Sequence, residues 1–290
     1  MHKPGPPLRV AVLDLYDGEP NQGMRALRAL LEDADGRFHG QAVTYAIYDV
    51  RAKAELPDLG YDVYLSSGGP GSPFDGEGTT WEHRYWRWLD ALYNHNERHA
   101  GSHLATDAKH VLFICHSYQM MCRFFEVARV TKRRSESFGI FPVHKTDAGR
   151  DDPQFAPLSD PFYAADFRHF QAVEPDAERI GELGGAVLAL EKPRPRIRLE
   201  RATMALRLSP EILGVQFHPE ADPEGMRHHF AQPKRMQHVV RKHGEPKYWR
   251  IMRRLVDPDF LAQTHDAFLP LFLRRAVEAQ RPEVIDARAA

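Results

Sequence analysis

Long hydrophobic runs, an excess charge of either sign and cysteine are all scarce in this sequence of 290 residues. No run approaches the ~18 uninterrupted apolar residues of a membrane-spanning helix. Lys and Arg number 39 against 40 Asp and Glu, so the net charge of −1 gives no overall attraction to DNA or anionic lipid. Residues 1–7 (MHKPGPP) contain no apolar stretch, which predicts that they are not a secretory signal. We therefore expect neither a membrane nor a nucleic acid as a partner.

The two cysteines of the sequence, Cys115 and Cys122, lie in one short segment. On the helix that this segment predicts, seven residues correspond to ~10 Å, which exceeds the ~7 Å Cα separation that a disulfide allows. We therefore expect two free thiols in a reduced, cytoplasmic protein. Any thiol chemistry rests on one of the two alone.

What the sequence does contain is an alternation of apolar segments with helical patterns, with 42% hydrophobic residues overall. This alternation is typical of an α/β fold with a mainly parallel, open sheet flanked by helices. The predicted strands are 8–15, 41–50, 61–66, 109–114 and 212–217, and the predicted helices among them are 21–32, 79–97 and 115–128.

The composition changes after residue 220. Between 221 and 256 there are nine Lys or Arg against three Asp or Glu, and the predicted helices there and beyond are 222–243, 245–256 and 264–279. Apolar stripes on these helices favour packing against the α/β part, or a homodimer contact, over a nucleic-acid site. The sequence thus predicts an α/β domain over 1–220 and a helical extension over 221–290.

Three short segments carry chemically useful residues, and each follows a predicted strand. Ligands of open α/β sheets collect at the carboxyl ends of the strands, where the loops converge. The first segment is the glycine-rich turn at residues 67–73 (SGGPGSP). Its backbone N–H groups can face an oxyanion at close range, although such a turn also serves as plain chain punctuation.

The second segment, residues 113–119 (FICHSYQ), places Cys115 at a strand-to-helix turn. Such a turn lifts a nucleophile above the sheet, and the helix N-terminus stabilises a thiolate. A lone cysteine is also a common small core residue, a role that fits Cys122. In the third segment, His218 can act as a base that Glu220 orients. A nucleophile, oxyanion donors and an oriented base together favour nucleophilic catalysis.

These segments resemble the three motif blocks of class I (triad) glutamine amidotransferases. The matching blocks are residues 67–73, Cys115 with Gln119 four residues later, and residues 214–220 (GVQFHPE). They follow the family's order within residues 8–220, and the nearest likeness is to the glutaminase domain of GMP synthetase. The resemblance implies a flavodoxin-like fold that belongs to this family.

The resemblance also implies a role for each matched residue. Cys115 is the nucleophile that attacks the glutamine side-chain amide, His218 is the general base and acid, and Glu220 orients it. Backbone N–H groups of two residues would form the oxyanion site: Gly69 and His116. Four residues would contact the glutamine: Gly71, Gln119, His169 and Phe170.

The chain departs from the family pattern around the nucleophile. The family has glycine two residues before and two after the cysteine, where this chain has Phe113 and Ser117. Phe113 predicts either a repacked elbow or a site whose geometry has drifted. His116 replaces an apolar residue, and its imidazole would either lower the pKa of the thiol or face solvent.

The expected substrate is glutamine, with no cofactor and no metal ion. The chain has no Gly-x-x-x-x-Gly-Lys loop for ATP, so it would pass ammonia to a separate synthetase subunit or to another acceptor. Two alternatives remain: a hydrolase of other γ-glutamyl amides, and a non-catalytic member of the fold that binds or senses a metabolite.

Overall fold

Short runs of buried aliphatic residues form the central strands, because a parallel sheet covered on both faces needs apolar side chains on both. All five residues of β4 (His110–Ile114) are buried. The computed structural model describes residues 6–33, 42–100, 107–194 and 200–280. Its other strands are β1 (Leu8–Asp14), β2 (Val43–Asp49), β3 (Val63–Ser66), β5 (Ala128–Lys145), β6 (Phe162–Pro175), β7 (Ala186–Glu191), β8 (Thr203–Arg207) and β9 (Ile212–Val215).

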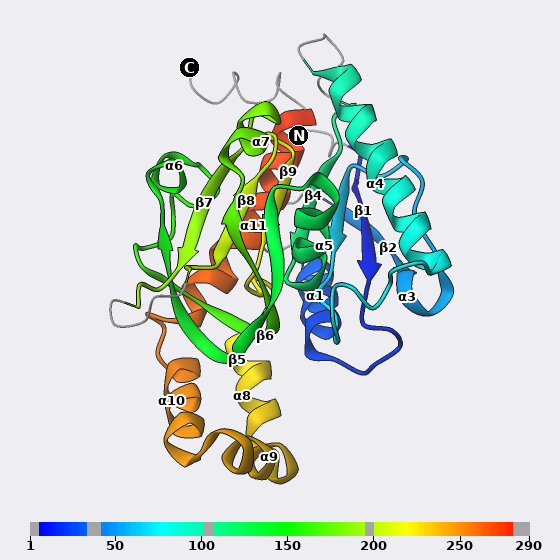
Figure 1. Cartoon of the computed structure of the whole chain (residues 1–290). Helices are drawn as coiled ribbons and strands as arrows, with labels where there is room; N and C mark the ends of the chain where they lie inside the picture. The colour runs from blue at the N-terminus through cyan, green and yellow to red at the C-terminus, as the bar shows by residue number, and fades with distance from the viewer. Residues whose placement is uncertain (1–5, 34–41, 101–106, 195–199, 281–290) are drawn as a thin grey trace, which may run out of the picture.

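The strands form one sheet in the order β2-β1-β3-β4-β9-β8-β7-β5-β6 (Figure 1). The pairs from β2 to β9 are parallel, and the pairs from β9 to β6 are antiparallel. The expected α/β fold with helices flanking the sheet is confirmed. The sheet is mixed, and its parallel half contains the strands that precede the three motif segments.

This strand order explains how segments far apart in the sequence come together. β4 lies between β3 and β9 and is parallel to both, with Leu112 paired to Leu65 on one side and to Leu213 on the other. The carboxyl ends of three adjacent parallel strands therefore meet at one edge of the sheet. The glycine-rich turn, Cys115 and the segment ending at Glu220 begin at this edge.

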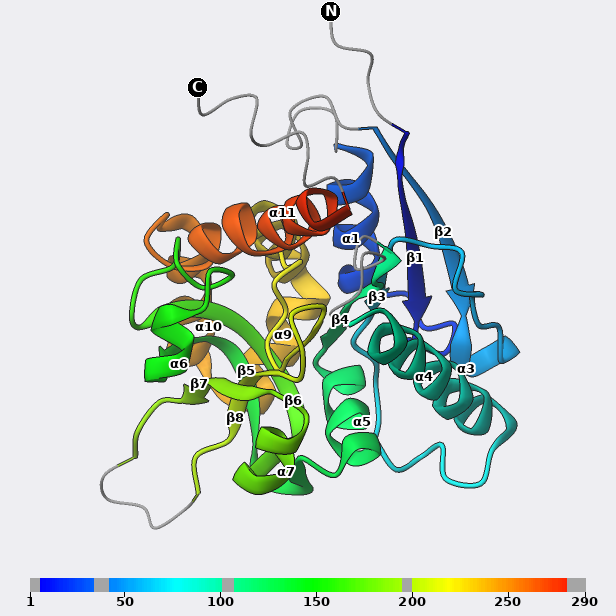
Figure 2. The ribbon, with the colours of Figure 1, turned by 90° about the horizontal axis from the view of Figure 1, so that it is seen from above.

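Helices cover both faces of the parallel half (Figure 2). On one face, α1 (Gln22–Glu32) and α11 (Leu261–Gln280) share a core with alternate residues of the central strands. On the other face, α4 (Thr80–His99) and α5 (His116–Phe125) pack against the remaining strand residues. The remaining helices are α3 (Val50–Lys53), α6 (Asp147–Asp151), α7 (Ala177–Glu182), α8 (Pro223–Ala231), α9 (Pro233–His243) and α10 (Glu245–Val256).

The single helix expected over 222–243 is wrong, because the structure has two helices, α8 and α9, with a break at Gln232. Pro233 has no N–H and disfavours the helical conformation of the residue before it. Gln232 is accordingly extended, with φ −61° and ψ 131°. The break turns the chain, so that α8 and α10 pack against β5 and β6 through a core that includes Ile140, Phe230 and Ile251.

The C-terminal helices are packed in two different places. Phe268 and Phe272 of α11 lie in the core on one face of the sheet, whereas α8 to α10 lie beside the long β5–β6 pair (Figure 1). The division of the chain at residue 220 stays a prediction. Among the described residues, no helix is long and apolar enough to cross a membrane. Cys115 and Cys122 are free, as their spacing predicted.

Candidate active site

Cys115 occupies a strained turn between β4 and α5. Its φ of 52° and ψ of −96° are rare for a residue with a side chain, and such conformations cost about 1–3 kcal/mol and concentrate at functional sites. The backbone N–H donates to the carbonyl of Val215 at 2.8 Å, which ties the turn to β9. The thiol is nearly buried and donates to the carbonyl of Phe167 in β6, with Sγ 3.9 Å from the oxygen. The turn therefore aims the sulfur at the carboxyl edge of the sheet.

The structure accommodates the two departures beside the cysteine by repacking. Phe113 is fully buried and pairs with Gly214 of β9. A Cβ on Gly214 would lie 2.5 Å from Tyr118 Cδ2 and 2.7 Å from Met121 Cε, so the close approach of helix to strand occurs at β9. Ser117 Oγ accepts from the N–H of Ile114 at 2.8 Å and donates to a carbonyl at the end of β3 at 2.7 Å. Ser117 thus fastens the elbow to the neighbouring strand.

His218 and Glu220 form a hydrogen-bonded pair just beyond the end of β9. His218 Nδ1 lies 2.7 Å from Glu220 Oε1, and the Glu220 side chain is only 1% exposed. The backbone N–H of His218 donates to the carbonyl of Ala165 at 2.9 Å, which fixes the segment against β6. A carboxylate at Nδ1 leaves Nε2 as the nitrogen that can exchange a proton with a reacting group.

The pKa of His218 depends on the charged groups around it. Burial acts to lower this pKa, but the charges of Glu220 and Cys115, together with hydrogen bonds to both, raise it well above its usual value. An imidazolium is therefore favoured at His218, beside the sulfur of Cys115. A positive charge beside a cysteine is typical of a site with a nucleophilic thiol.

The glycine-rich turn lies beside Cys115 and His218. A Cβ on Gly68 would lie 2.8 Å from His218 Cε1 and 3.6 Å from Cys115 Cβ, so the thiol and the imidazole flank one glycine. A Cβ on Gly69 would lie 2.5 Å from the carbonyl oxygen of Leu15. Gly71 has φ of +83°, where glycine is favoured. The turn thus needs glycine for close approach at two positions and for its backbone angle at a third.

Gly68→Ala is expected to lower kcat/KM for the reaction proposed below by about 10²-fold, because the new methyl displaces the imidazole by a fraction of an ångström to about 1 Å. Steady-state kinetics measure this loss, and thermal unfolding checks that the fold persists. Gly181→Ala in α7 is the matched control, since its Cβ would meet nothing within 4 Å. Equal activity of the two variants would show that Gly68 does not border the reacting groups.

His116 neither faces solvent nor carries a charge that could lower the pKa of the thiol. Its side chain is buried, and burial, reinforced by the positive charges of Arg51 and Arg123, lowers the pKa of His116 to about 3. The imidazole is thus neutral at physiological pH. Both roles suggested for it by the sequence are corrected: it is an uncharged core group that follows the nucleophile.

The burial of two histidines, His116 and His110, predicts a loss of stability in acid. As at His116, burial lowers the pKa of His110, in this case to about 4. Between about pH 6.5 and these values the unfolded chain binds protons that the folded chain does not, so the free energy of unfolding falls as pH falls. Each histidine contributes a slope of up to about 1.4 kcal/mol per pH unit. His116→Gln is expected to remove one such slope in urea unfolding between about pH 6 and 4.5, whereas the control His238→Gln, at an exposed site on α9, is expected to keep it. Equal slopes for both variants would contradict the burial argument.

The residues expected to contact glutamine are distributed unevenly. Gln119 is buried, and its Nε2 donates to the carbonyl of Phe170 at 3.1 Å and to Gln216 Oε1 at 3.0 Å. Gln119 and Phe170 are therefore in contact. His169 is 57% exposed, and its Nε2 lies 3.5 Å from Glu136 at the surface. The structure thus brings Gln119 and Phe170 together and turns His169 toward another partner, whereas Gly71, the fourth expected residue, lies in the glycine-rich turn.

Sequence reasoning missed two residues beside this site. The hydroxyl of Tyr16, two residues after β1, lies 3.1 Å from the position of a Cβ on Gly68. Burial, followed by the charges of Glu220 and Cys115, raises the pKa of Tyr16 well above its usual value. Arg51 Nη1 donates to the carbonyl of Pro70 at 2.7 Å and so holds the glycine-rich turn. The rule that ligands bind at the carboxyl ends of strands could have found Tyr16, because β1 ends at the same edge of the sheet as the strands before the three motif segments.

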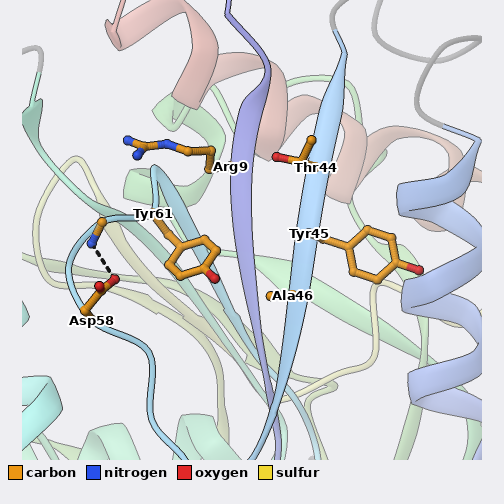
Figure 3. A pocket seen from close by; sticks show the side chains of 7 residues that line it. Arg9, Thr44, Tyr45, Ala46, Asp58 and Tyr61 are labelled. Carbon is orange, nitrogen blue, oxygen red and sulfur yellow. Dashed lines mark hydrogen bonds between the residues drawn. The ribbon is translucent and has the colours of Figure 1, made fainter.

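A hollow of about 420 Å³ lies elsewhere, beside the edge strand β2 (Figure 3). Arg9 and Thr44 come from near the amino ends of β1 and β2, opposite the edge where Cys115 lies. This hollow is therefore separate from the candidate active site. Its lining residues are Arg9, Thr44, Tyr45, Ala46, Asp58, Gly60 and Tyr61.

Comparison with solved structures identifies the fold. A glutamine amidotransferase from Thermotoga maritima superposes with a TM-score of 0.65 at 16% identity, over 93% of this chain and 98% of that one. A glutamine amido transferase from Methylobacillus flagellatus gives 0.61 at 13% identity, over 94% of each chain. A Thermoplasma acidophilum protein, provisionally described as part of a GMP synthase, gives 0.50 at 19% identity, over 75% of this chain and 86% of that one.

The sequence comparisons add no relative. No protein-family model matches the chain, and no curated protein does so. The identities to the solved structures are low, so the likeness establishes a class I glutamine amidotransferase-like fold.

Proposed function

We propose that the chain hydrolyses the side-chain amide of glutamine through a thioester on Cys115. The observation that carries this proposal is the hydrogen-bonded His218–Glu220 pair beside a cysteine in a strained strand-to-helix turn. A fold shared with glutamine amidotransferases supports the same reaction class. Fold alone does not determine chemistry, so the proposed reaction rests on the geometry of these three residues.

The proposed reaction has two steps. The Cys115 thiolate attacks the amide carbon, and the N–H groups of Gly69 and His116 stabilise the oxyanion. The His218 imidazolium gives its proton to the leaving nitrogen, which departs as ammonia and leaves a glutamyl thioester. Water then attacks the thioester with His218 as base, glutamate departs, and the thiolate and imidazolium are restored.

Substrate binding and the fate of ammonia belong to the same proposal. Gly71, Gln119 and Phe170 would contact the glutamine from the turn, from α5 and from β6, with His169 at the rim. The ammonia would go to a separate synthetase subunit or another acceptor in the cytoplasm. The residues 1–220 would form the amidotransferase domain, with 221–290 packed on it or contacting a second copy.

The test is ammonia release by the purified full chain, measured with glutamine, asparagine and γ-glutamyl peptides side by side. The proposal expects turnover of glutamine and little turnover of asparagine, whose amide lies one methylene closer to the α-carbon. Turnover of γ-glutamyl peptides alone would assign the site to other γ-glutamyl amides. Binding of glutamine without turnover, with and without added synthetases, would assign it to metabolite sensing.

A further inference from the structure

A second cluster of reactive side chains lies where α4 ends and β4 is about to begin. His95, His99 and Asp107 each offer one potential ligand atom, and these atoms lie within 4.8 Å of one another. The cluster is near the amino end of β4, whereas Cys115 follows the carboxyl end of the same strand. It is therefore outside the candidate active site. No metal ion was expected from the sequence, and this cluster is the reason to propose one.

The two imidazoles are arranged side by side. His95 and His99 are one helical turn apart on α4, so they share a face of the helix. Their ring centroids are 4.2 Å apart and the ring planes differ by 30°. His99 Nδ1 donates to the carbonyl of His95 at 2.6 Å, which places the lone pair of the neutral ring on Nε2. A backbone hydrogen bond that fixes the tautomer is typical of metal-binding histidines.

The carboxylate stands at a suitable distance from the first imidazole. His95 Nε2 lies 3.6 Å from Asp107 Oδ2. Bond lengths of about 2.0–2.2 Å and tetrahedral angles place two ligand atoms of one Zn²⁺ about 3.4 Å apart. His95 and Asp107 are thus close to that separation already. His95 Nε2 also lies 3.0 Å from the backbone carbonyl oxygen of Asp107, to which it donates. An ion at Nε2 would replace this hydrogen bond and leave the proton of the neutral ring on Nδ1. Side-chain shifts of about 1 Å would bring all three ligand atoms to it.

The ligand types and the neighbouring charge decide which ion fits. Two imidazoles with one carboxylate suit Zn²⁺ and similar late transition ions, whereas Mg²⁺ and Ca²⁺ prefer oxygen ligands. Lys109 Nζ lies 2.8 Å from Asp107 Oδ1. Lys109 occupies one of its oxygens, and its charge opposes a second cation.

We propose that His95, His99 and Asp107 bind one Zn²⁺ ion that links the end of α4 to the residues preceding β4. Water would complete the tetrahedron, as at other sites with three protein ligands. The ion joins two segments that the backbone connects through residues 100–106. Because the ion binds the folded arrangement and not the unfolded chain, it raises the melting temperature.

The experiment is calorimetric titration of the full chain, without a histidine tag, with Zn²⁺ in the Cys115→Ser background, which removes the reactive thiol as a competing ligand. We expect one Zn²⁺ per chain and a higher melting temperature. In His95→Ala/His99→Ala the affinity of this site is expected to fall at least about 100-fold, and the melting temperature no longer responds to the metal. Asp107→Asn, at a side chain that is 56% exposed, provides a second variant with little risk to folding.

Two further variants separate the site from casual binding by surface histidines. His228→Ala/His229→Ala removes an adjacent pair in the last turn of α8 and is expected to keep the stoichiometry and affinity. Lys109→Gln is expected to raise the affinity by about tenfold, because it removes a positive charge beside the ion. Zn²⁺ binding that is lost with His228 and His229, or that is unchanged in His95→Ala/His99→Ala and Asp107→Asn, would overturn the proposal. Absence of binding at one equivalent would overturn it as well.

Discussion

Cys115→Ser is expected to lower kcat/KM for glutamine hydrolysis by about 10⁴-fold or more. A serine hydroxyl is a much weaker nucleophile than a cysteine sulfur at the same position. The backbone strain and the helix N-terminus remain in the variant, so the loss reports the sulfur itself. The fold is expected to persist, since oxygen for sulfur is a small change in volume. Ammonia release coupled to a glutamate assay measures both products and excludes ammonia from contaminants.

Cys122→Ala is the matched control for this substitution. Cys122 lies in α5, two turns from Cys115, and is fully buried. Burial raises the pKa of its thiol to about 12, so it stays protonated and unreactive. We expect Cys122→Ala to lose stability through a small cavity and to keep kcat. If Cys115→Ser retained full activity while Cys122→Ala lost it, the assignment of the nucleophile would be wrong.

Glu220→Gln is expected to lower kcat by about 10³–10⁴-fold. The carboxylate accepts from His218 Nδ1 at 2.7 Å, which keeps the proton on that nitrogen and leaves Nε2 to serve the reaction. An amide NH₂ at the same place would favour the other tautomer, with the proton on Nε2. The loss is expected in kcat with KM little changed, because the proposed role of Glu220 is to orient the imidazole and not to contact glutamine.

Glu224→Gln provides the same chemical change four residues later, at an exposed position in the first turn of α8. It is expected to retain kcat within a factor of about two.

The pH dependence of kcat is a second measurement, and it would not change if Glu220 had only a structural role. Glu220→Gln should shift the limb that belongs to His218 to lower pH, because the negative charge of Glu220 raises the pKa of His218 in the native chain. An unshifted profile with full activity would remove Glu220 from the account.

The parallel half of the sheet explains why sequence reasoning located the candidate site. The strands before the glycine-rich turn, before Cys115 and before His218 are adjacent and parallel, so residues at their ends converge. Strand ends are visible in a sequence as the point where an apolar run meets glycine or polar residues. The rule that ligands bind at carboxyl strand ends then brought the three segments together without coordinates.

Other features depend on tertiary packing that no local pattern encodes. The neutrality of His116 follows from burial beneath charged neighbours that are distant in sequence, such as Arg51. The way in which Phe113 is accommodated depends on Gly214, about a hundred residues later and one strand away. The antiparallel half of the sheet is built from β5 and β6, whose long pairing contains register shifts that a periodic pattern does not reveal. All three features depend on which helices and strands become neighbours in the folded chain.

The break between α8 and α9 was readable from the sequence and was overlooked. Pro233 and its extended predecessor Gln232 are a recognised end of a helix, and the apolar periodicity on both sides obscured it. Tyr16 is a similar case, since it follows β1 at the productive edge. The cluster of His95, His99 and Asp107 was not readable in this way, because Asp107 comes close to the two histidines only in the folded chain.

The most direct test of the central claim is covalent trapping of Cys115, the residue proposed to form the thioester. The full chain is incubated with diazo-oxo-norleucine, a glutamine analogue that alkylates a nucleophile with loss of N₂, and the intact mass and the peptide map are then measured. We predict one adduct per chain, located on Cys115, protected by glutamine and absent from Cys115→Ser. An unmodified chain, or an adduct on Cys122 or another residue with Cys115 untouched, would contradict it.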